Sequence, residues 1–542
     1  MTIRIAACVW LLAVVLAGRP VLTQAPGAAH AGAAFQLSTE CFACHNGLAT
    51  PAGEDVSIGV AWRASMMANS SRDPYWHAAV RRETIDHPDA REAIEEECSI
   101  CHMPMAHTAA RAAGGKPEIF AHLPVGADTS EQGLLAADGV SCTLCHQISP
   151  ERLGTPESFV GGFVIAPPSA SGIRAMLGPY EIDRGRTAIM RSSTGLTPTE
   201  AQHVRQSELC ATCHTLFTTA LGPGGKPIGR FPEQVPYLEW RHSAWREERS
   251  CQSCHMPAVA EPTRIASVLG EPRERPGRHT FLGGNFFMLR MLNRYRAELG
   301  VAALPNELEG AASATLRQLA SDTANVAVSG PALAGDRLAF DVTVSNLTGH
   351  KFPTGYPSRR AWLHVTVRDA NGATVFESGA LDPRGAIAGN DNDADADRFE
   401  PHHDVITDAG QVQIYEAIMT GAGGAVTTGL LQAVAYAKDN RLLPRGFDKR
   451  TADADIAVHG EAAADDDFAG TGDRVSYAVN VAGRQAPFSV DVALRYQPIA
   501  FRWAQNLRRY DAPEPARFVG YFDSMAGASS AIIARGTAAT AR

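Results

Sequence analysis

Ten of the eleven cysteines of this chain fall into five pairs, each separated by two residues and each followed at once by a histidine. Two thiols at this spacing can add across the two vinyl groups of one haem, and the histidine that follows turns its imidazole onto the iron. The spacing therefore predicts five covalently bound haem c groups. The motifs read CFACH, CSICH, CTLCH, CATCH and CQSCH, and their residues are Cys41, Cys44, His45, Cys98, Cys101, His102, Cys142, Cys145, His146, Cys210, Cys213, His214, Cys251, Cys254 and His255.

Zinc ribbons and redox dithiols also use cysteines separated by two residues. A zinc ribbon needs such pairs two at a time and has no requirement for a histidine directly after each pair. Many cysteines in an exported chain would also suggest disulfides. The regular pairing leaves only Cys8 outside a motif, so haem attachment is the interpretation that accounts for the whole pattern.

Each haem iron takes a second axial ligand or keeps that position open, and histidine and methionine are the usual donors. His203 lies just ahead of the fourth motif, His242 ahead of the fifth and His279 beyond it. His350 lies in a loop with glycine and proline, residues 346–360, that could reach back to an iron. We expect the distal ligands among these four. The weaker candidates are His77, His87, His107, His122, Met66, Met67, Met103, Met105 and Met256.

The N-terminal residues are typical of an export signal. Arg4 precedes an apolar run over residues 5–18, and small residues around position 30 suit cleavage, so residues 1–31 are expected to be a signal peptide. The mature protein is then periplasmic or otherwise exported, and no later segment is apolar enough to give it a stable membrane span. A net charge of −9 disfavours nucleic acid as a partner.

The predicted secondary structure changes along the chain, from short helices around the motifs to strands further on. Around the motifs we expect short helices, such as residues 74–83 and 91–97, and loops that wrap closely spaced haems. This predicts an α-rich multihaem domain with little regular structure over residues 35–290. The apolar patterns of residues 286–299 and 307–322 predict further helices, and residues 291–328 are expected to form a helical linker.

Further along, apolar and polar residues alternate in the manner of strands. Residues 362–367 and 373–378 flank the sequence DANG, a strong hairpin signal, and residues 338–344, 412–418, 475–481 and 488–496 are further expected strands. We therefore expect an all-β, sandwich-like domain over residues 329–500. The acidic stretch 390–397 lacks the spacing of an EF-hand and is expected to be a solvated loop. Residues 501–542 are expected to be a C-terminal tail.

The motif region resembles the multihaem cytochrome superfamily that includes the tetrahaem electron carrier of nitrifying bacteria, hydroxylamine oxidoreductase and octahaem tetrathionate reductase. The similar segments are CSICHMPM, SELCATCH, PYLEWRHS before CQSCHMP, and RHTFLGGN around His279. The resemblance implies haems stacked in pairs, mostly with bis-histidine ligation from sequence-distant residues, which favours His203, His242 and His279. The segments GHKFPTG and DNRLLPRGFD also look like parts found behind haem domains in other bacterial multihaem proteins.

Two functions stay open at this stage. In the first, the chain carries electrons between redox partner proteins, and every iron has a ligand on both sides. In the second, it is an oxidoreductase for a small nitrogen or sulfur compound that binds at one open iron, with Tyr75, Tyr237, His77 or Arg72 handling protons. No motif ends in lysine, and the octahaem enzymes carry three more haems, so neither family activity carries over. The β-region is either a structural cap or a partner-binding surface.

Overall fold

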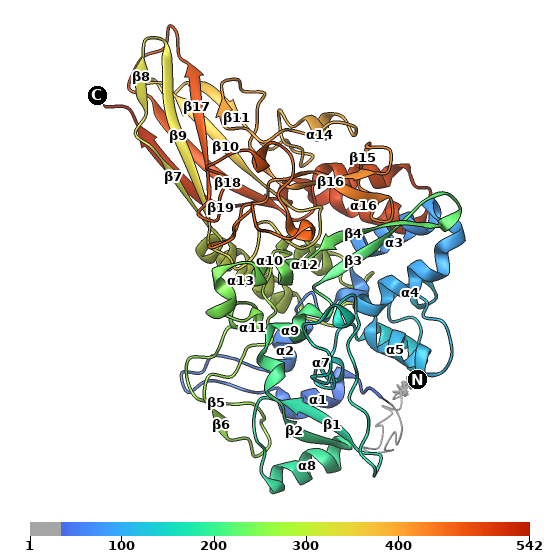
Figure 1. Ribbon diagram of the computed structural model, residues 1–542. Helices are drawn as coiled ribbons and strands as arrows, with labels where there is room; N and C mark the ends of the chain where they lie inside the picture. Colours follow the sequence, from blue (N-terminus) through green and yellow to red (C-terminus); the bar gives the residue numbers. More distant parts are fainter. Residues whose placement is uncertain (1–33, 542) are drawn as a thin grey trace, which may run out of the picture.

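The computed structural model describes residues 34–541, so the predicted signal peptide lies outside the described residues. The five motifs lie in a helical part at one end of the molecule, and long strands form the other end (Figure 1). Within the described range no helix combines the length and apolarity needed to cross a membrane.

Short helices and three two-stranded sheets make up the motif part. The helices are α1 (Ser38–His45), α2 (Ile58–Arg63), α3 (Pro74–Asp86), α4 (Arg91–His102), α5 (Pro104–Ala112), α6 (Glu131–Ala137), α7 (Cys142–Cys145), α8 (Arg184–Thr194), α9 (Ser207–Ala211), α10 (Pro236–Arg241) and α11 (Cys251–His255). The paired strands are β1 (Arg174–Gly178) with β2 (Leu196–Glu200), β3 (Leu216–Leu221) with β4 (Pro227–Gln234), and β5 (Thr263–Arg264) with β6 (Pro272–Arg273).

The predicted helices at residues 74–83 and 91–97 are confirmed as parts of α3 and α4. Helix α3 begins where the carboxylate of Asp73 accepts hydrogen bonds from the backbone N–H groups of Tyr75 and Trp76, with Pro74 at the first helical position. Helix α4 continues through the second motif to His102. The motif cysteines therefore extend from helical turns that the local sequence stabilises.

Two five-stranded sheets dominate the other part. One has the order β11 (Thr374–Ser378), β10 (Arg360–Arg368), β18 (Ser489–Gln497), β19 (Ala531–Ala539), with β13 (Ile414–Tyr415) beside β10. The other has the order β12 (Val405–Ile406), β17 (Asp473–Asn480), β9 (Arg337–Asn346), β7 (Ala324–Val328), with β8 (Ala332–Ala334) beside β9. The predicted hairpin is confirmed, because β10 and β11 pair in antiparallel fashion across the DANG turn.

A smaller sheet reaches back toward the motif part. It consists of β14 (Ala417–Gly421), β15 (Val426–Thr427) and β16 (Ala433–Asp439). The Tyr436 hydroxyl donates to the Pro232 carbonyl of β4 at 2.8 Å, and the Tyr436 ring lies 4.7 Å from that of Phe231. Strands β4 and β16 therefore join the two parts of the chain.

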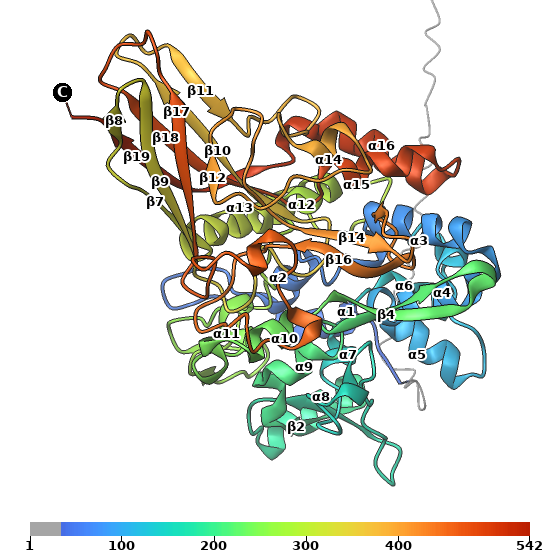
Figure 2. The ribbon, with the colours of Figure 1, turned by 45° about the horizontal axis from the view of Figure 1, so that its top comes forward.

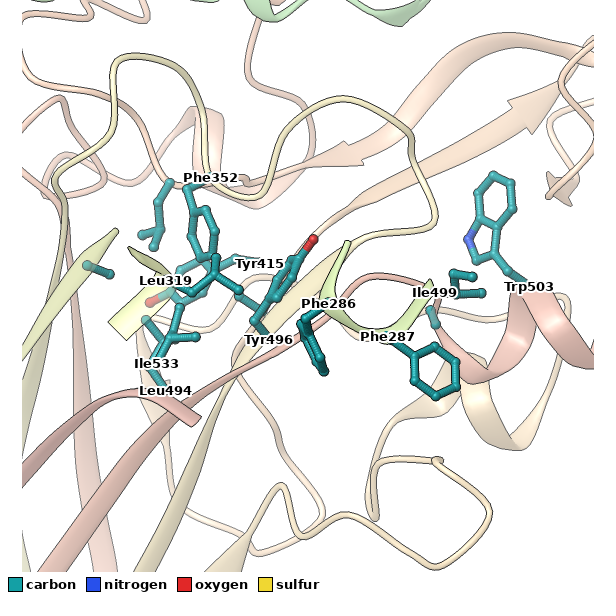
Figure 3. Close-up of a cluster of buried hydrophobic side chains, with 14 of the residues drawn as sticks. Phe286, Phe287, Leu319, Phe352, Tyr415, Leu494, Tyr496, Ile499, Trp503 and Ile533 are labelled. Carbon is teal, nitrogen blue, oxygen red and sulfur yellow. The ribbon is translucent and has the colours of Figure 1, made fainter. Parts of the chain in front are cut away.

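The expected helical linker is buried in the centre of the molecule. Helices α12 (Phe286–Arg294) and α13 (Pro305–Asp322) confirm the helical pattern, but Phe286, Phe287 and Leu292 are each at most 1% exposed. Figure 3 shows Phe286 beside Tyr496 of strand β18 and Phe287 beside Ile499. One hydrophobic core thus runs from the motif part into the β-part, and α12 is a shared element of that core.

The expected tail is wrong, because residues 501–539 are mostly regular structure. Helices α15 (Phe501–Asn506) and α16 (Pro513–Met525) are followed by strand β19, which pairs with β18. Helix α16 lies on α3, with the Phe518 and Tyr75 rings 5.0 Å apart and Glu514 paired with Arg81 at 2.8 Å (Figure 2). The C-terminal segment therefore returns to cover the motif part.

Small residues hid strand β19 in the sequence, and the structure explains why they are needed. A Cβ at Gly536 would lie 2.9 Å from Val328 and 3.1 Å from Val326 of strand β7. The expected solvated loop at residues 390–397 is also corrected, since Asp393 is buried and binds Arg360 of β10 through both oxygens at 2.8 Å. The amino-acid composition of these two segments indicated neither the contact of β19 with β7 nor the ion pair of Asp393 with Arg360.

Replacing Gly536 with valine should destabilise the protein by about 1–3 kcal/mol, because the new side chain overpacks the contact with strand β7. Denaturant unfolding followed by circular dichroism measures the change. Thr537→Val is the matched control, because Thr537 is an exposed neighbour on the same strand. Equal stability of the two variants would contradict the close approach of β19 to β7.

Candidate haem-attachment site

The cysteines of different motifs lie against one another. All ten described cysteines are free and half-buried. Thiols of different motifs lie close enough to shift each other's pKa in three pairs, Cys41 with Cys142, Cys101 with Cys213, and Cys210 with Cys251.

A fourth pair of cysteines from different motifs, Cys145 and Cys213, also lies close together. Burial raises the pKa of Cys145 to about 12, and Cys213 of the fourth motif adds to that rise. The first motif therefore borders the third, and the second, third and fifth motifs all border the fourth. The attachment sites form one connected group with the fourth motif at its branch point.

Four of the five motif histidines are oriented by a backbone carbonyl. The Nδ1 atoms of His45 and His146 each lie 2.6 Å from a carbonyl oxygen, of Ile265 and Leu177 respectively. His255 makes the same bond with Leu282. A carbonyl can only accept, so Nδ1 carries the proton in each ring and the Nε2 lone pair is left for a metal. This is the orienting contact typical of metal-bound histidines.

The fourth oriented ring is that of His102. Its Nδ1 lies 3.2 Å from the Ser70 carbonyl oxygen, and the ring stacks on Trp76 with centroids 4.4 Å apart and planes 2° from parallel. The tryptophan face and the carbonyl together allow the imidazole one orientation. Helix α3, which carries Trp76, thereby positions the ligand of the second motif.

Two motif histidines face a second histidine from far along the sequence. The His146 and His279 ring centroids are 6.3 Å apart with an interplanar angle of 21°. The His255 and His350 centroids are 6.2 Å apart with an angle of 15°. In a metal-bound imidazole pair, two bonds of about 2 Å place the ring centres about 6 Å apart. The donor sets of the third and fifth motifs therefore fit a haem iron.

The two distant rings are oriented like the motif rings. Nδ1 of His279 donates to the Gly277 carbonyl at 3.2 Å, and Nδ1 of His350 donates to the Lys351 carbonyl at 2.9 Å. Burial lowers the pKa of His279 to about 3 and that of His350 to about 4. Both imidazoles are therefore neutral at neutral pH, the form that binds a metal.

His203 and His242, two of the predicted distal ligands, each have Nε2 against a backbone carbonyl. Nε2 of His203 donates to the Ile148 carbonyl at 2.8 Å, and Nε2 of His242 to the Asp448 carbonyl at 3.0 Å. Neither ring stacks across from a motif histidine in the described part of the chain. Closeness to a motif in sequence does not place a side chain on the opposite face of the site.

Three of the four weaker histidine candidates have protein partners of their own, whereas Nε2 of the fourth, His87, is buried without a hydrogen-bond partner among the described residues. Nε2 of His77 donates to the Ser71 carbonyl at 2.8 Å, the His107 ring lies 3.0 Å from the Ser99 hydroxyl, and Nδ1 of His122 lies 3.1 Å from an Asp128 carboxylate oxygen. These bonds satisfy one nitrogen of each ring.

His214 of the fourth motif differs from the other four motif histidines. Among the described residues no carbonyl binds its Nδ1, and no second histidine ring stacks across from it. Burial lowers the pKa of His214 to about 4, and the nearby Arg359 guanidinium lowers it further. Arg359 is fixed by the Thr354 carbonyl at 2.6 Å and by Asn285 at 3.2 Å.

A buried polar cluster lies near the second motif, where the Glu233 carboxylate adds to the raised pKa of the Cys98 and Cys101 thiols. The rings of Tyr75 and Tyr356 meet edge to face, with centroids 5.6 Å apart. Burial raises the pKa of Glu233 to about 7, although a hydrogen bond from Thr218 opposes the rise. Of the predicted proton-handling residues, Tyr75 belongs to this cluster, whereas Tyr237 donates to Glu208 at 3.2 Å outside it.

A buried charge network holds the loop that carries His350. Lys351 lies 2.7 Å from Asp439, Arg441 lies 2.8 Å from Asp439, and the other end of Arg441 lies 2.9 Å from Glu239 of helix α10. Each of the four side chains is at most 8% exposed. Burial by itself would raise the pKa of Asp439, but Arg441 and Lys351 hold it below its usual range.

The network ties three sequence-distant segments to one another. Glu239 also accepts hydrogen bonds from the backbone N–H of Lys351, at 3.1 Å, and from the Thr354 hydroxyl. The segments PYLEWRHS, GHKFPTG and DNRLLPRGFD each contribute to it. The sequence signalled these segments only by resemblance, and their charged residues were not identified as a unit.

No model of a known protein family matches this chain, and no curated protein matches it. Among solved structures, the chain is similar to a penta-heme cytochrome c552 from Thermochromatium tepidum, with a TM-score of 0.48 and 15% sequence identity. The alignment covers 89% of this chain and 95% of that one.

Asp439→Asn should lower the free energy of unfolding by about 3–5 kcal/mol, because it leaves the buried Lys351 ammonium without a carboxylate. Chemical denaturation of the purified protein measures the loss. Glu248→Gln is the control: it breaks the exposed pair with Arg445 and should cost below about 1 kcal/mol. A similar small cost for both variants would show that the network does not stabilise the fold.

Proposed function

We propose that this chain is an exported multihaem c-type cytochrome that carries electrons between redox partner proteins. The observation that carries the proposal is the pair of facing imidazole sets, His146 with His279 and His255 with His350, each beside a pair of motif cysteines. When bound, haem iron supplies one-electron redox chemistry. The ten motif cysteines would attach five haem c groups, with His279 and His350 as distal ligands at the third and fifth motifs.

The contacts between motifs support a carrier. The thiols of neighbouring motifs lie against one another, so the attachment sites are adjacent and none is isolated. The first motif connects to the fourth through the third, and the second and fifth motifs each connect to the fourth directly. We call these three connections the arms of the group, and they meet at the fourth motif. A donor and an acceptor protein can then dock at different arms of one connected group.

In this proposal the β-part both covers the motif part and holds the loop that carries His350. His350 lies between strands β9 and β10, so the proposed distal ligand of the fifth motif comes from the β-part itself. We propose that the two five-stranded sheets form a sandwich that caps the haem group and holds this loop. Export to the periplasm is part of the same proposal and rests on the N-terminal residues.

The purified protein should contain five haems per chain, counted from its haem absorbance against protein concentration. His279→Ala and His350→Ala should each convert one haem from low-spin to high-spin, because each removes one axial imidazole. Electron paramagnetic resonance of the oxidised protein measures the conversion. His364→Ala, which removes a ring bound to Glu377 on β11, should leave all spin states unchanged. A fully low-spin His279→Ala or His350→Ala protein would refute the corresponding ligand.

A second function is favoured by the surroundings of His214. This ring has no histidine opposite it among residues 34–541, Arg359 lies near it, and Glu233 lies near Cys101 of the second motif, which borders the fourth. A guanidinium binds anionic oxygens, and a buried carboxyl whose pKa is near 7 can give and take a proton. These residues suit an oxidoreductase that acts on a small nitrogen or sulfur oxyanion.

If this second function holds, the wild-type protein should contain one high-spin haem per chain, and this haem alone should bind added cyanide. Quantitative electron paramagnetic resonance before and after the addition measures both. A high-spin signal would direct assays to nitrite, hydroxylamine and tetrathionate, and Glu233→Gln should then slow turnover. Fully low-spin wild-type protein would leave the carrier function alone.

A further inference from the structure

A cluster of carboxylates lies far along the chain from the haem motifs, where the two large sheets meet. Asp465 and Asp467 follow the helical turn at residues 461–463, and Asp473 begins strand β17. One oxygen from each of these three residues lies within 4.8 Å of the others. Asp404, just before strand β12, contributes a further oxygen near that of Asp465. Strands β12 and β17 are labelled in Figure 2.

Asp473 brings a buried oxygen without a partner into this cluster. The residue is 2% exposed. Its Oδ2 accepts hydrogen bonds from the Tyr415 hydroxyl at 2.7 Å and from Gln413 at 3.0 Å. Its Oδ1 has no hydrogen-bond partner among the described residues and faces Nε2 of His402 at 3.8 Å, beside Asp465. A buried carboxylate oxygen left in this way normally costs free energy unless a cation or a donor meets it.

The other two carboxylates are fixed by the protein and keep lone pairs for a ligand. Asp465 accepts from the Asp467 backbone N–H at 3.0 Å, and Asp467 pairs with Arg474 at 2.5 Å. The Lys449 ammonium binds the Asp465 carbonyl. Two cations, Arg474 and Lys449, also lie in this part of the chain.

His402 is excluded as a ligand by its own hydrogen bonds. Its Nδ1 accepts from the side-chain amides of Gln413 at 2.9 Å and Asn440 at 3.0 Å. Both amides have a fixed orientation, because the Gln413 oxygen accepts from the His403 backbone N–H and the Asn440 oxygen from that of Glu416. The proton of the neutral ring is thus on Nε2, which donates to Asp465 at 3.1 Å.

We propose that Asp465, Asp467 and Asp473 bind a calcium ion that joins the loop before strand β17 to the opposite sheet. The site offers oxygen atoms alone, which suits Ca²⁺ and excludes the nitrogen and sulfur ligands typical of zinc. The ion reaches the second sheet through Asp473, because Tyr415 of strand β13 holds the Oδ2 of that residue. Calcium therefore stabilises the sheet contact that supports the His350 loop.

The test uses the full-length purified protein with its haems, treated with a chelator and dialysed. Isothermal titration with CaCl₂ should show one site per chain, and the midpoint of thermal unfolding should rise with calcium concentration. Asp465→Asn keeps an oxygen for the His402 N–H but removes a charge, so it should weaken calcium binding by about 10-fold or more. Asp466→Asn is the matched control, because the exposed Asp466 lies outside the cluster and should leave binding unchanged.

Several outcomes would overturn the proposal. They are the absence of binding heat together with an unchanged unfolding midpoint, wild-type calcium affinity in Asp465→Asn, and tighter binding of Mg²⁺ or Zn²⁺ than of Ca²⁺. Asp467→Asn provides a second test in case Asp465→Asn fails to fold, and its affinity must also fall. The haem count and spin states are measured in parallel, so failure of this site is distinguished from failure of the proposed electron-transfer function.

Discussion

The buried pairing of Glu239, Arg441, Asp439 and Lys351 is the constraint on which the arrangement of the two parts of the molecule depends. Removing such charges from water costs several kcal/mol per ion, and only close partners in a fixed geometry offset that cost. A small displacement of the His350 loop would leave Lys351 unpaired in the interior. The network therefore gives the loop one position, and that position places His350 opposite His255.

This constraint explains why the motif part and the β-part share a core. A distal imidazole on a separately moving domain would not stay about 6 Å from its partner ring. Helix α12 fills the space between the parts with Phe286 and Phe287, and strand β16 and helix α16 bind the motif part from two further directions. Each contact removes a relative motion that would separate the facing rings. The β-part thus fixes the distance between the His255 and His350 rings.

The features that the sequence predicted are those determined by neighbouring residues. The cysteine spacing, the helical turns, the hairpin at DANG and the alternating strands all depend on residues within a few positions of one another. The contacts of His146 with His279 and of Asp439 with Lys351 join residues more than 80 positions apart, which no local pattern records. His203 lies beside a motif in the sequence, and its hydrogen bond with the Ile148 carbonyl, 55 residues away, is equally invisible to a local pattern. Small residues likewise concealed strand β19, since close packing against Val326 and Val328 selects them.

The same geometry bears on the choice between carrier and oxidoreductase. Facing imidazoles occur at the third and fifth motifs, which lie on either side of the fourth. His214 at the branch point has neither a carbonyl nor a facing ring among the described residues, yet it has Arg359 beside it. Arg359 near His214 and the titratable carboxyl of Glu233 near the second motif are groups with which an enzyme binds an anion and moves a proton. The two proposed functions are therefore compatible within one connected group of motifs.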